Sequence, residues 1–181
     1  MVDLSNNSKS ALLVIDMQNG LFRAKSTPYN HQLILSNILK LIEHHRSNSK
    51  QIIFVRHVGE KDTPLDSNSP NTQLIADLSL NSDKDIVIEK RYPSSFKNTD
   101  LKEVLEKLGI DEIIVTGMKT EYCIDTTIRA ASEFGYKVTL ISDAHTTSDS
   151  ITLDAQHIID HHNQVFSNAF ANVKTTEEFL Y

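Results

Sequence analysis

Short apolar runs alternate with helical patterns along nearly the whole chain, and this alternation limits the possible folds more than any other feature. Five runs are predicted strands: Ala11–Ile15, Ile52–Val55, Ile86–Ile88, Ile113–Val115 and Val138–Ile141. Such runs, which contain almost no polar residues, are typical of strands buried on both faces. Strands that alternate with helices form a parallel sheet with helices on both sides. The sequence therefore predicts a three-layer α/β sandwich.

The helical patterns lie between these runs and after them. From His31 to Ser47, apolar residues recur at three- and four-residue intervals, which is typical of an amphipathic helix. Three further helices are predicted at Leu101–Leu108, Ile124–Phe134 and Ser150–Val165. A short strand near Ala169–Val173 is expected to follow them.

Several residues beside these helices are types that favour helix ends. Asp100 and Glu103 are expected to cap the start of helix Leu101–Leu108, and Gly109 to end it in the left-handed conformation. Gly135 is expected to close the next helix in the same way. Thr175 and Glu178 can form a capping box for a last helical turn. The only long stretch without a clear pattern is Val58–Asp85, and a connection of that length is usually functional or flexible.

Length and charge narrow the class of protein. A chain of 181 residues suits one domain, residues 1–181, because single domains reach about 250 residues. The net charge of -6 argues against a nucleic-acid partner, which would need a surplus of Lys and Arg. No apolar run approaches the ~18 residues that span a bilayer, and the polar residues 1–10 do not resemble a secretory signal. We therefore expect a cytoplasmic protein without a membrane partner.

Three reactive side chains follow predicted strands. Asp16 comes directly after the first strand, Lys90 two residues after the third, and Cys123 eight residues after the fourth, at the expected start of a helix. In an open parallel sheet, ligands bind at the carboxyl ends of the strands. Taken singly, each residue also has an ordinary interpretation: a turn aspartate, a solvated lysine and a buried structural cysteine. Together they predict a reactive site at one edge of the sheet.

Cys123 is the only cysteine, so it cannot form an internal disulfide or a cysteine-rich metal site. A thiol at a helix N-terminus meets the positive end of the helix dipole, and a nearby Lys90 ammonium would also stabilise its thiolate. We therefore expect the pKa of Cys123 to lie below that of a free thiol. An alternative function is a thiol-based redox or electrophile sensor that uses the same cysteine without turnover, although no second cysteine exists to resolve a sulfenic acid.

The histidines do not form a metal-binding pattern. His57 follows the second strand, but no second ligand stands beside it at a metal spacing. His145 follows the fifth predicted strand and is expected either to cap a turn or to line the site. We therefore predict no metal and no other cofactor.

Three segments resemble the catalytic motifs of the isochorismatase-like cysteine hydrolases. These segments are Val14–Gln18, Glu89–Phe96 and Thr116–Cys123, and Ser142–His145 resembles a further element of that family. The resemblance runs from Ala11 to Phe170 with the motifs in the family's order. It implies a Rossmann-like, six-stranded parallel sheet of order 3-2-1-4-5-6, in which the first and fourth strands are neighbours.

The resemblance also implies a reaction. It assigns an Asp-Lys-Cys catalytic triad to Asp16, Lys90 and Cys123, without a metal ion. It further implies a cis peptide bond between Met118 and Lys119, with the backbone N–H groups of Lys119 and Cys123 forming an oxyanion hole. The expected reaction is hydrolysis of an amide-type C–N bond in a small molecule through a thioester on Cys123. The expected assembly is a homo-oligomer, a dimer or tetramer.

The substrate cannot be derived from the motifs. Nicotinamidases of this family carry an Asp-x-His metal motif after the second strand, and Val55–Gly59 lacks it, so nicotinamide is a less favoured substrate. Cys123 also argues against the vinyl-ether chemistry of isochorismate-cleaving members. The sequence Thr120–Cys123 looks closer to the broad branch of amidases that includes streptothricin hydrolase-like members. Candidate pocket walls are Gln18, Phe22, Phe96 and Tyr122, of which the aromatic residues can equally belong to a core or an interface.

Overall fold

Six parallel strands form one sheet in a computed structural model that describes residues 9–181. The strands are β1 (Ser10–Ile15), β2 (Gln51–His57), β3 (Ile86–Lys90), β4 (Glu112–Met118), β5 (Lys137–Thr146) and β6 (Asn172–Lys174). Their order in the sheet is β3-β2-β1-β4-β5-β6, which confirms the predicted topology. The expectation that the chain begins without a secretory signal rests mainly on residues 1–8, which lie outside the described residues.

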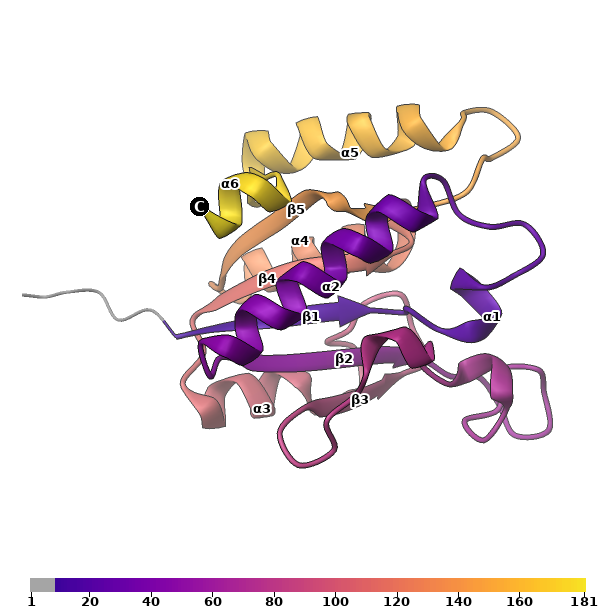
Figure 1. Ribbon diagram of the computed structural model, residues 1–181, viewed down its shortest axis with the longest axis horizontal. Coiled ribbons are helices and arrows are strands. Elements are labelled where there is room, and N and C mark those ends of the chain that lie inside the picture. The colour runs from indigo at the N-terminus through magenta and orange to yellow at the C-terminus, as the bar shows by residue number, and fades with distance from the viewer. Residues whose placement is uncertain (1–8) are drawn as a thin grey trace, which may run out of the picture.

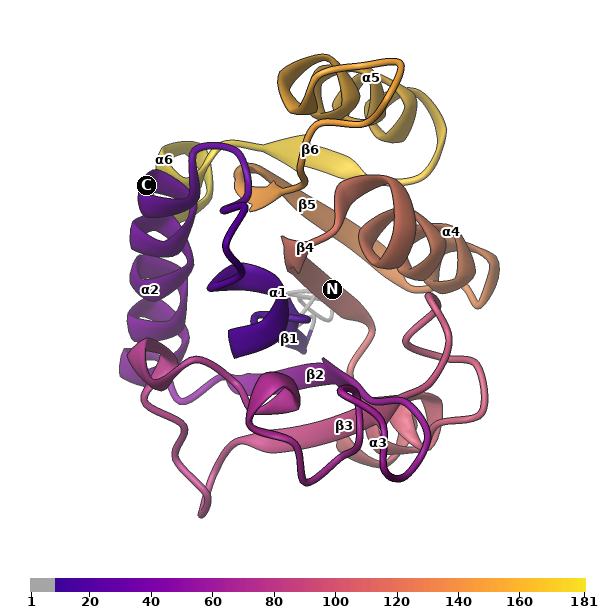
Figure 2. The ribbon, with the colours of Figure 1, turned by 90° about the vertical axis from the view of Figure 1, so that its right-hand side faces the viewer.

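Helices cover both faces of the sheet, as Figures 1 and 2 show. The helices are α1 (Asn19–Phe22), α2 (His31–Ser47), α3 (Leu101–Leu108), α4 (Asp125–Glu133), α5 (Ala155–Ala169) and α6 (Thr176–Leu180). Helix α2 lies on one side of the sheet with α6, and α3, α4 and α5 lie on the other. The predicted three-layer sandwich is therefore confirmed.

The apolar runs form strands because each strand buries both of its faces. Side chains of a strand point alternately to opposite sides of the sheet. In β1, Leu13 and Ile15 pack into the core under α3 and α4, while Leu12 and Val14 pack into the core under α2. All four side chains are fully buried. This explains why β1 is continuously apolar rather than alternating.

Strand β5 is longer than predicted and runs to Thr146. Its polar residues find partners at the neighbouring edge of the sheet: Ser142 Oγ donates to the carbonyl of Lys174, and Asp143 Oδ1 accepts from the N–H and hydroxyl of Thr176. The expectation that Ser142–His145 follows the fifth strand is therefore wrong, because this segment is part of the strand. Strand β6, in contrast, is confined to Asn172–Lys174.

The bounds of α5 and the N-terminal cap of α3 differ from the sequence expectation, and α5 ends at Ala169 rather than Val165. Helix α5 begins at Ala155 rather than Ser150, because the Asp154 side chain accepts the N–H of His157 as an N-cap. Asp100 makes no side-chain capping bond to α3, and Thr99 Oγ1 accepts the N–H of Leu101 instead.

The other predicted helix caps are confirmed. Gly109 ends α3 with a φ of +67°, and Gly135 follows α4 with a φ of +86°. The capping box of Thr175 and Glu178 is present at α6.

The long connection between β2 and β3 packs against the sheet. It contains two short 3₁₀ turns, Pro70–Thr72 and Ala76–Leu78, and buries Ile75 and Leu78 in the core under α2. Arg56 at the end of β2 also holds it, through a bond to the carbonyl of Ser67. Within residues 9–181, no helix is both long and apolar enough to cross a membrane.

Candidate active site

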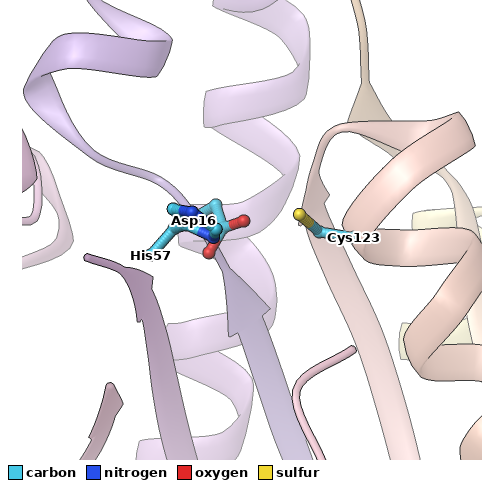
Figure 3. Close-up of side chains that lie close together, drawn as sticks. All are labelled: Asp16, His57 and Cys123. Atoms are coloured by element: carbon cyan, nitrogen blue, oxygen red, sulfur yellow. The ribbon is translucent and has the colours of Figure 1, made fainter. Parts of the chain in front are cut away.

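The carboxyl ends of β1, β3 and β4 bring the three predicted residues together. Lys90 lies at the end of β3, Asp16 directly after β1, and Cys123 in a single π-helical turn, Thr120–Ile124, between β4 and α4. Lys90 Nζ donates to Asp16 Oδ2 at 2.8 Å and to Cys123 Sγ at 3.1 Å. Figure 3 shows the side chains of Asp16 and Cys123 pointing toward each other. These contacts join residues that are 74 and 33 positions apart in the chain.

A fourth residue, His57, completes this cluster. It is the last residue of β2 and pairs in register with Lys90 on β3. Its Nδ1 lies 3.2 Å from Lys90 Nζ, so the ammonium has an acceptor for each of its three hydrogens. The Lys90 side chain has 0% exposure, so water cannot supply any of these contacts. The sequence placed His57 after a strand but not beside Lys90, because that requires the register of β2 and β3.

Burial shifts the proton affinities of the cluster. Removal from water raises the pKa of the Asp16 carboxyl, and the charge of Lys90 opposes this shift only in part. Burial also raises the pKa of Cys123 to about 12, and the negative charge of Asp16 adds to the increase. The expected low thiol pKa is therefore wrong: desolvation and Asp16 outweigh the charge of Lys90. Both shifts act against ionisation: they favour the neutral thiol of Cys123 and increase the basicity of Asp16.

The cluster resembles the ligand set of a metal ion but contains its own positive charge. Asp16, His57 and Cys123 each offer one suitable atom, and these atoms lie within 4.8 Å of one another. The Lys90 ammonium, however, donates to all three side chains. A metal ion bound to the same atoms would have to displace that ammonium, which would leave a buried cation without partners.

The backbone around the site has three unusual conformations. Asp16 has a φ of +55°, and its N–H donates to the carbonyl of Val55 on β2. Gly117 has a φ of +113°, and a Cβ there would lie 2.1 Å from the carbonyl oxygen of Ile15. Only glycine fits this close approach of β4 to β1. The third unusual conformation is the peptide bond between Met118 and Lys119, which is cis, as the resemblance implied.

The cis bond leads directly into the turn that carries the cysteine. The Lys119 carbonyl accepts the N–H groups of Tyr122 and Ile124, both at 3.1 Å. These two bonds close the π-helical turn around Cys123. Isolated π-helical turns are rare and occur frequently at functional sites.

The four candidate pocket residues lie in different environments. Phe22 is fully buried in the core under α2, and Phe96 is buried on the other face against Phe134 and Tyr136, which favours the core interpretation for both. Tyr122 is 57% exposed beside Cys123, so it is the one aromatic residue of the four that is free to meet a ligand.

Gln18 is buried and supports the site through the backbone. Its side-chain amide donates to the carbonyls of His57 and Thr72, and its Oε1 accepts the N–H of His57. Both amide hydrogens and the oxygen are therefore engaged with the chain itself. The structure gives Gln18 the role of a brace between β2 and the connection that follows it.

His145 does not line the cluster of Asp16, Lys90 and Cys123. It is fully buried, and its two ring nitrogens bond to Thr120 Oγ1 and Asn163 Oδ1, both at 2.9 Å. Because burial lowers its pKa to about 4, the ring is neutral, with Nε2–H donating to Asn163 and Nδ1 accepting from Thr120. His145 therefore links β5 to the π-helical turn and to α5.

Comparisons with known proteins show which family the chain resembles. The family model of the isochorismatase domain matches residues 10–178. The chain is 35% identical over 178 residues to the uncharacterised isochorismatase family protein YddQ of Bacillus subtilis strain 168, covering 94% of this chain and 98% of that one. It is also 35% identical to nicotinamidase 3 of Arabidopsis thaliana over 156 residues, covering 78% of this chain and 75% of that protein.

Solved structures show the same architecture. The crystal structure of a cysteine hydrolase from Pseudomonas syringae pv. phaseolicola superimposes with a TM-score of 0.89 at 28% identity, covering 95% of this chain and 91% of the other. The topology, the site at the carboxyl edge of the sheet and the match of the family model over nearly the full chain lead to one conclusion. The chain belongs to the isochorismatase family.

Proposed function

We propose that this protein hydrolyses an amide-type C–N bond in a small molecule, with Cys123 as nucleophile, Asp16 as general acid and base, and Lys90 as the charge that holds them together. The observation that carries this proposal is the buried Lys90 ammonium, which donates to both the Asp16 carboxylate and the Cys123 sulfur. A nucleophile within reach of a base, with a third group that orients both, is the arrangement that covalent catalysis requires.

In the first half of the reaction, the Cys123 thiol attacks the carbonyl carbon while its proton passes to Asp16. The raised pKa of Asp16 makes it a better proton acceptor than an ordinary aspartate. The raised pKa of Cys123 means that attack and proton transfer occur together rather than from a preformed thiolate. The C–N bond then breaks, the nitrogen leaves with the proton from Asp16, and a thioester remains on Cys123.

In the second half, water hydrolyses the thioester. Asp16 removes a proton from the attacking water, the carbon–sulfur bond breaks, and the proton returns to the sulfur. The products are a carboxylic acid and ammonia or an amine. Lys90 keeps its proton throughout and stabilises the negative charge that moves between the carboxylate and the sulfur.

The tetrahedral intermediates require donors for their oxyanion. We assign this role to the backbone N–H groups of Lys119, which directly precedes the π-helical turn, and of Cys123, which lies within it. Loss of one such donor typically costs about 3 kcal/mol of transition-state stabilisation. The hydrogen bonds of the turn fix the positions of these backbone donors before the substrate arrives.

The substrate class is a small molecule with a carboxamide or carbamoyl group. Relatives include nicotinamidase 3 of Arabidopsis thaliana and, at 26% identity, streptothricin hydrolase of Streptomyces noursei. Nicotinamide is the less favoured candidate because Val55–Gly59 lacks the Asp-x-His motif. We also propose that the chain acts as a homo-oligomer, a dimer or tetramer, which light scattering would measure.

The test is release of ammonia or amine from a panel of linear primary amides, cyclic amides, carbamoyl compounds and nicotinamide. Wild-type protein is compared with Cys123→Ala, Asp16→Asn and Lys90→Met. Lys102→Met, at a lysine on the outer face of α3 whose side chain is 44% exposed, is the control for Lys90→Met. We expect release that disappears in Cys123→Ala and in Asp16→Asn and persists in Lys102→Met. Mass spectrometry after acid quenching should show the acyl group on Cys123. Release that survives in Cys123→Ala, or no release from any class, would contradict the proposal.

A further inference from the structure

The Lys90 ammonium depends on a third acceptor that lies outside the proposed triad. Two of its hydrogens go to Asp16 and Cys123, and the third points to His57 Nδ1 at 3.2 Å. The lysine side chain is fully buried, so no solvent replaces a missing acceptor. A buried charged donor that lacks an acceptor costs free energy. The ammonium is therefore held at a position where His57 can accept its third hydrogen.

The geometry requires a neutral imidazole at this position. An ammonium can donate to Nδ1 only if that nitrogen carries a lone pair, so the ring proton must be on Nε2. The groups that face the ring agree with this: burial and the positive charge of Lys90 lower the pKa of His57, and only the charge of Asp16 acts in the opposite direction.

The backbone of His57 is fixed on both sides. Gln18 Oε1 accepts its N–H at 2.7 Å, and Gln18 Nε2 donates to its carbonyl at 2.9 Å. The next residue, Val58, donates its N–H to the carbonyl of Lys90 at 2.8 Å. Gln18 lies two residues after Asp16, so the turn that carries the carboxylate also carries the clamp on the histidine. Figure 3 shows the His57 ring beside Asp16, opposite Cys123.

We infer that His57 is a positioning residue of this active site: its neutral imidazole holds the Lys90 ammonium in contact with both Asp16 and Cys123, and Gln18 holds the imidazole. This inference rests on the proposed function, because it concerns the same nucleophile. Without the third acceptor, the ammonium moves toward the carboxylate, which is its strongest partner, and away from the sulfur. The negative charge that develops on the sulfur during attack then loses part of its stabilisation.

Alkylation of Cys123 tests the inference without a known substrate. The chain has a single cysteine, so iodoacetamide labels one site. In this reaction the sulfur bonds to the methylene carbon, iodide leaves, and the thiol proton passes to Asp16 or solvent. The variants are His57→Leu, which removes the acceptor, and His57→Asn, whose amide oxygen can occupy nearly the place of Nδ1. His161→Leu, at an exposed histidine of α5, is the matched control.

We expect the alkylation rate at pH 8 to fall about tenfold in His57→Leu, as the loss of a hydrogen bond to a charged group implies. The rate should stay within about threefold of wild type in His57→Asn and be unchanged in His161→Leu. Far-UV circular dichroism and the urea midpoint establish that each variant is folded. Equal loss in His57→Asn and His57→Leu would overturn the inference, because a merely structural role is not restored by an acceptor atom.

A double-mutant cycle with Lys90→Met identifies the path of the effect. If His57 acts through Lys90, His57→Leu has no further effect on alkylation once Lys90 is replaced. Additive losses would overturn the inference. With a substrate from the amide panel, His57→Leu should lower kcat and leave KM within about twofold. Failure of the panel would contradict the proposed function alone, since the alkylation result does not depend on turnover.

Discussion

Replacement of Lys90 by methionine should destabilise the protein strongly and in a pH-dependent way. Methionine keeps most of the lysine volume but removes the charge that faces Asp16 Oδ2 at 2.8 Å. With an effective dielectric constant of about 20, two unit charges at that distance attract each other by roughly 6 kcal/mol. The cost of desolvating both groups offsets part of this attraction. Loss of one partner of a buried pair typically costs about 3–5 kcal/mol, and we expect that range at pH 8.

The pH dependence follows from Asp16. Its other oxygen, Oδ1, is buried and has no hydrogen-bond partner among residues 9–181. Without Lys90, the pKa of Asp16 in the folded state rises further above its unfolded value of 3.8. The folded state then binds more protons than the unfolded state, so stability is lost as pH rises from about 4 through the folded pKa. Lys90→Met should therefore be less destabilised at pH 5 than at pH 8.

Urea unfolding followed by far-UV circular dichroism measures these differences; the chain has no tryptophan for a fluorescence assay. The double variant Asp16→Asn with Lys90→Met should recover part of the stability at pH 8, because it removes the buried charge that was left unpaired. Lys102→Met, at a lysine whose side chain is 44% exposed and forms a surface ion pair with Glu106, should change stability by less than about 0.5 kcal/mol. A loss below about 1 kcal/mol in Lys90→Met, or an equal loss at pH 5 and pH 8, would refute this reasoning.

Two further predictions concern the surroundings of the site. Gly117→Ala should cost about 3 kcal/mol or more in thermal or urea unfolding, because the new Cβ would lie 2.1 Å from the Ile15 carbonyl oxygen. Gly109→Ala, which meets open space at a φ of +67°, should cost only about 1 kcal/mol, and equal losses would contradict the argument. Burial lowers the pKa of His145 from 6.5 to about 4, so its share of stability is present above pH 6.5 and is lost as pH falls toward 4. Between pH 7.5 and pH 5, the free energy of unfolding of the wild type should fall by about 2 kcal/mol through His145. The free energy of unfolding of His145→Asn should fall by less over this interval. A fall in His145→Asn as large as that of the wild type would contradict this assignment.

The sequence predicted the sheet well because the relevant signals are local. A strand that buries both faces must be apolar throughout, and this pattern identified five of the strands. Strand β5 was predicted too short because Ser142 and Asp143 are polar. Their partners, Lys174 and Thr176, belong to the last strand and helix, which the local pattern does not place beside them.

The candidate site was predictable in its members but not in its electrostatics. The rule that ligands bind at strand ends, together with the family motifs, selected Asp16, Lys90 and Cys123. It did not identify His57 as a partner of Lys90, because that contact depends on the register of two strands. The expected direction of the shift in the pKa of Cys123 was also wrong. A helix start and a lysine are visible in a sequence, whereas the depth of burial that outweighs them is not.

The Lys90 ammonium also connects β3 to β1 and β4, two strands with which β3 shares no backbone pairing. Strand β3 lies at an edge and pairs only with β2, so it is one of the strands most exposed to local opening. Through one side chain it also contacts β2 at His57, the turn after β1 at Asp16, and the segment after β4 at Cys123. The polar contacts proposed for catalysis thus also hold the edge strand β3 against the central strands of the sheet. Fraying of β3 would therefore separate Lys90 from Asp16 and Cys123.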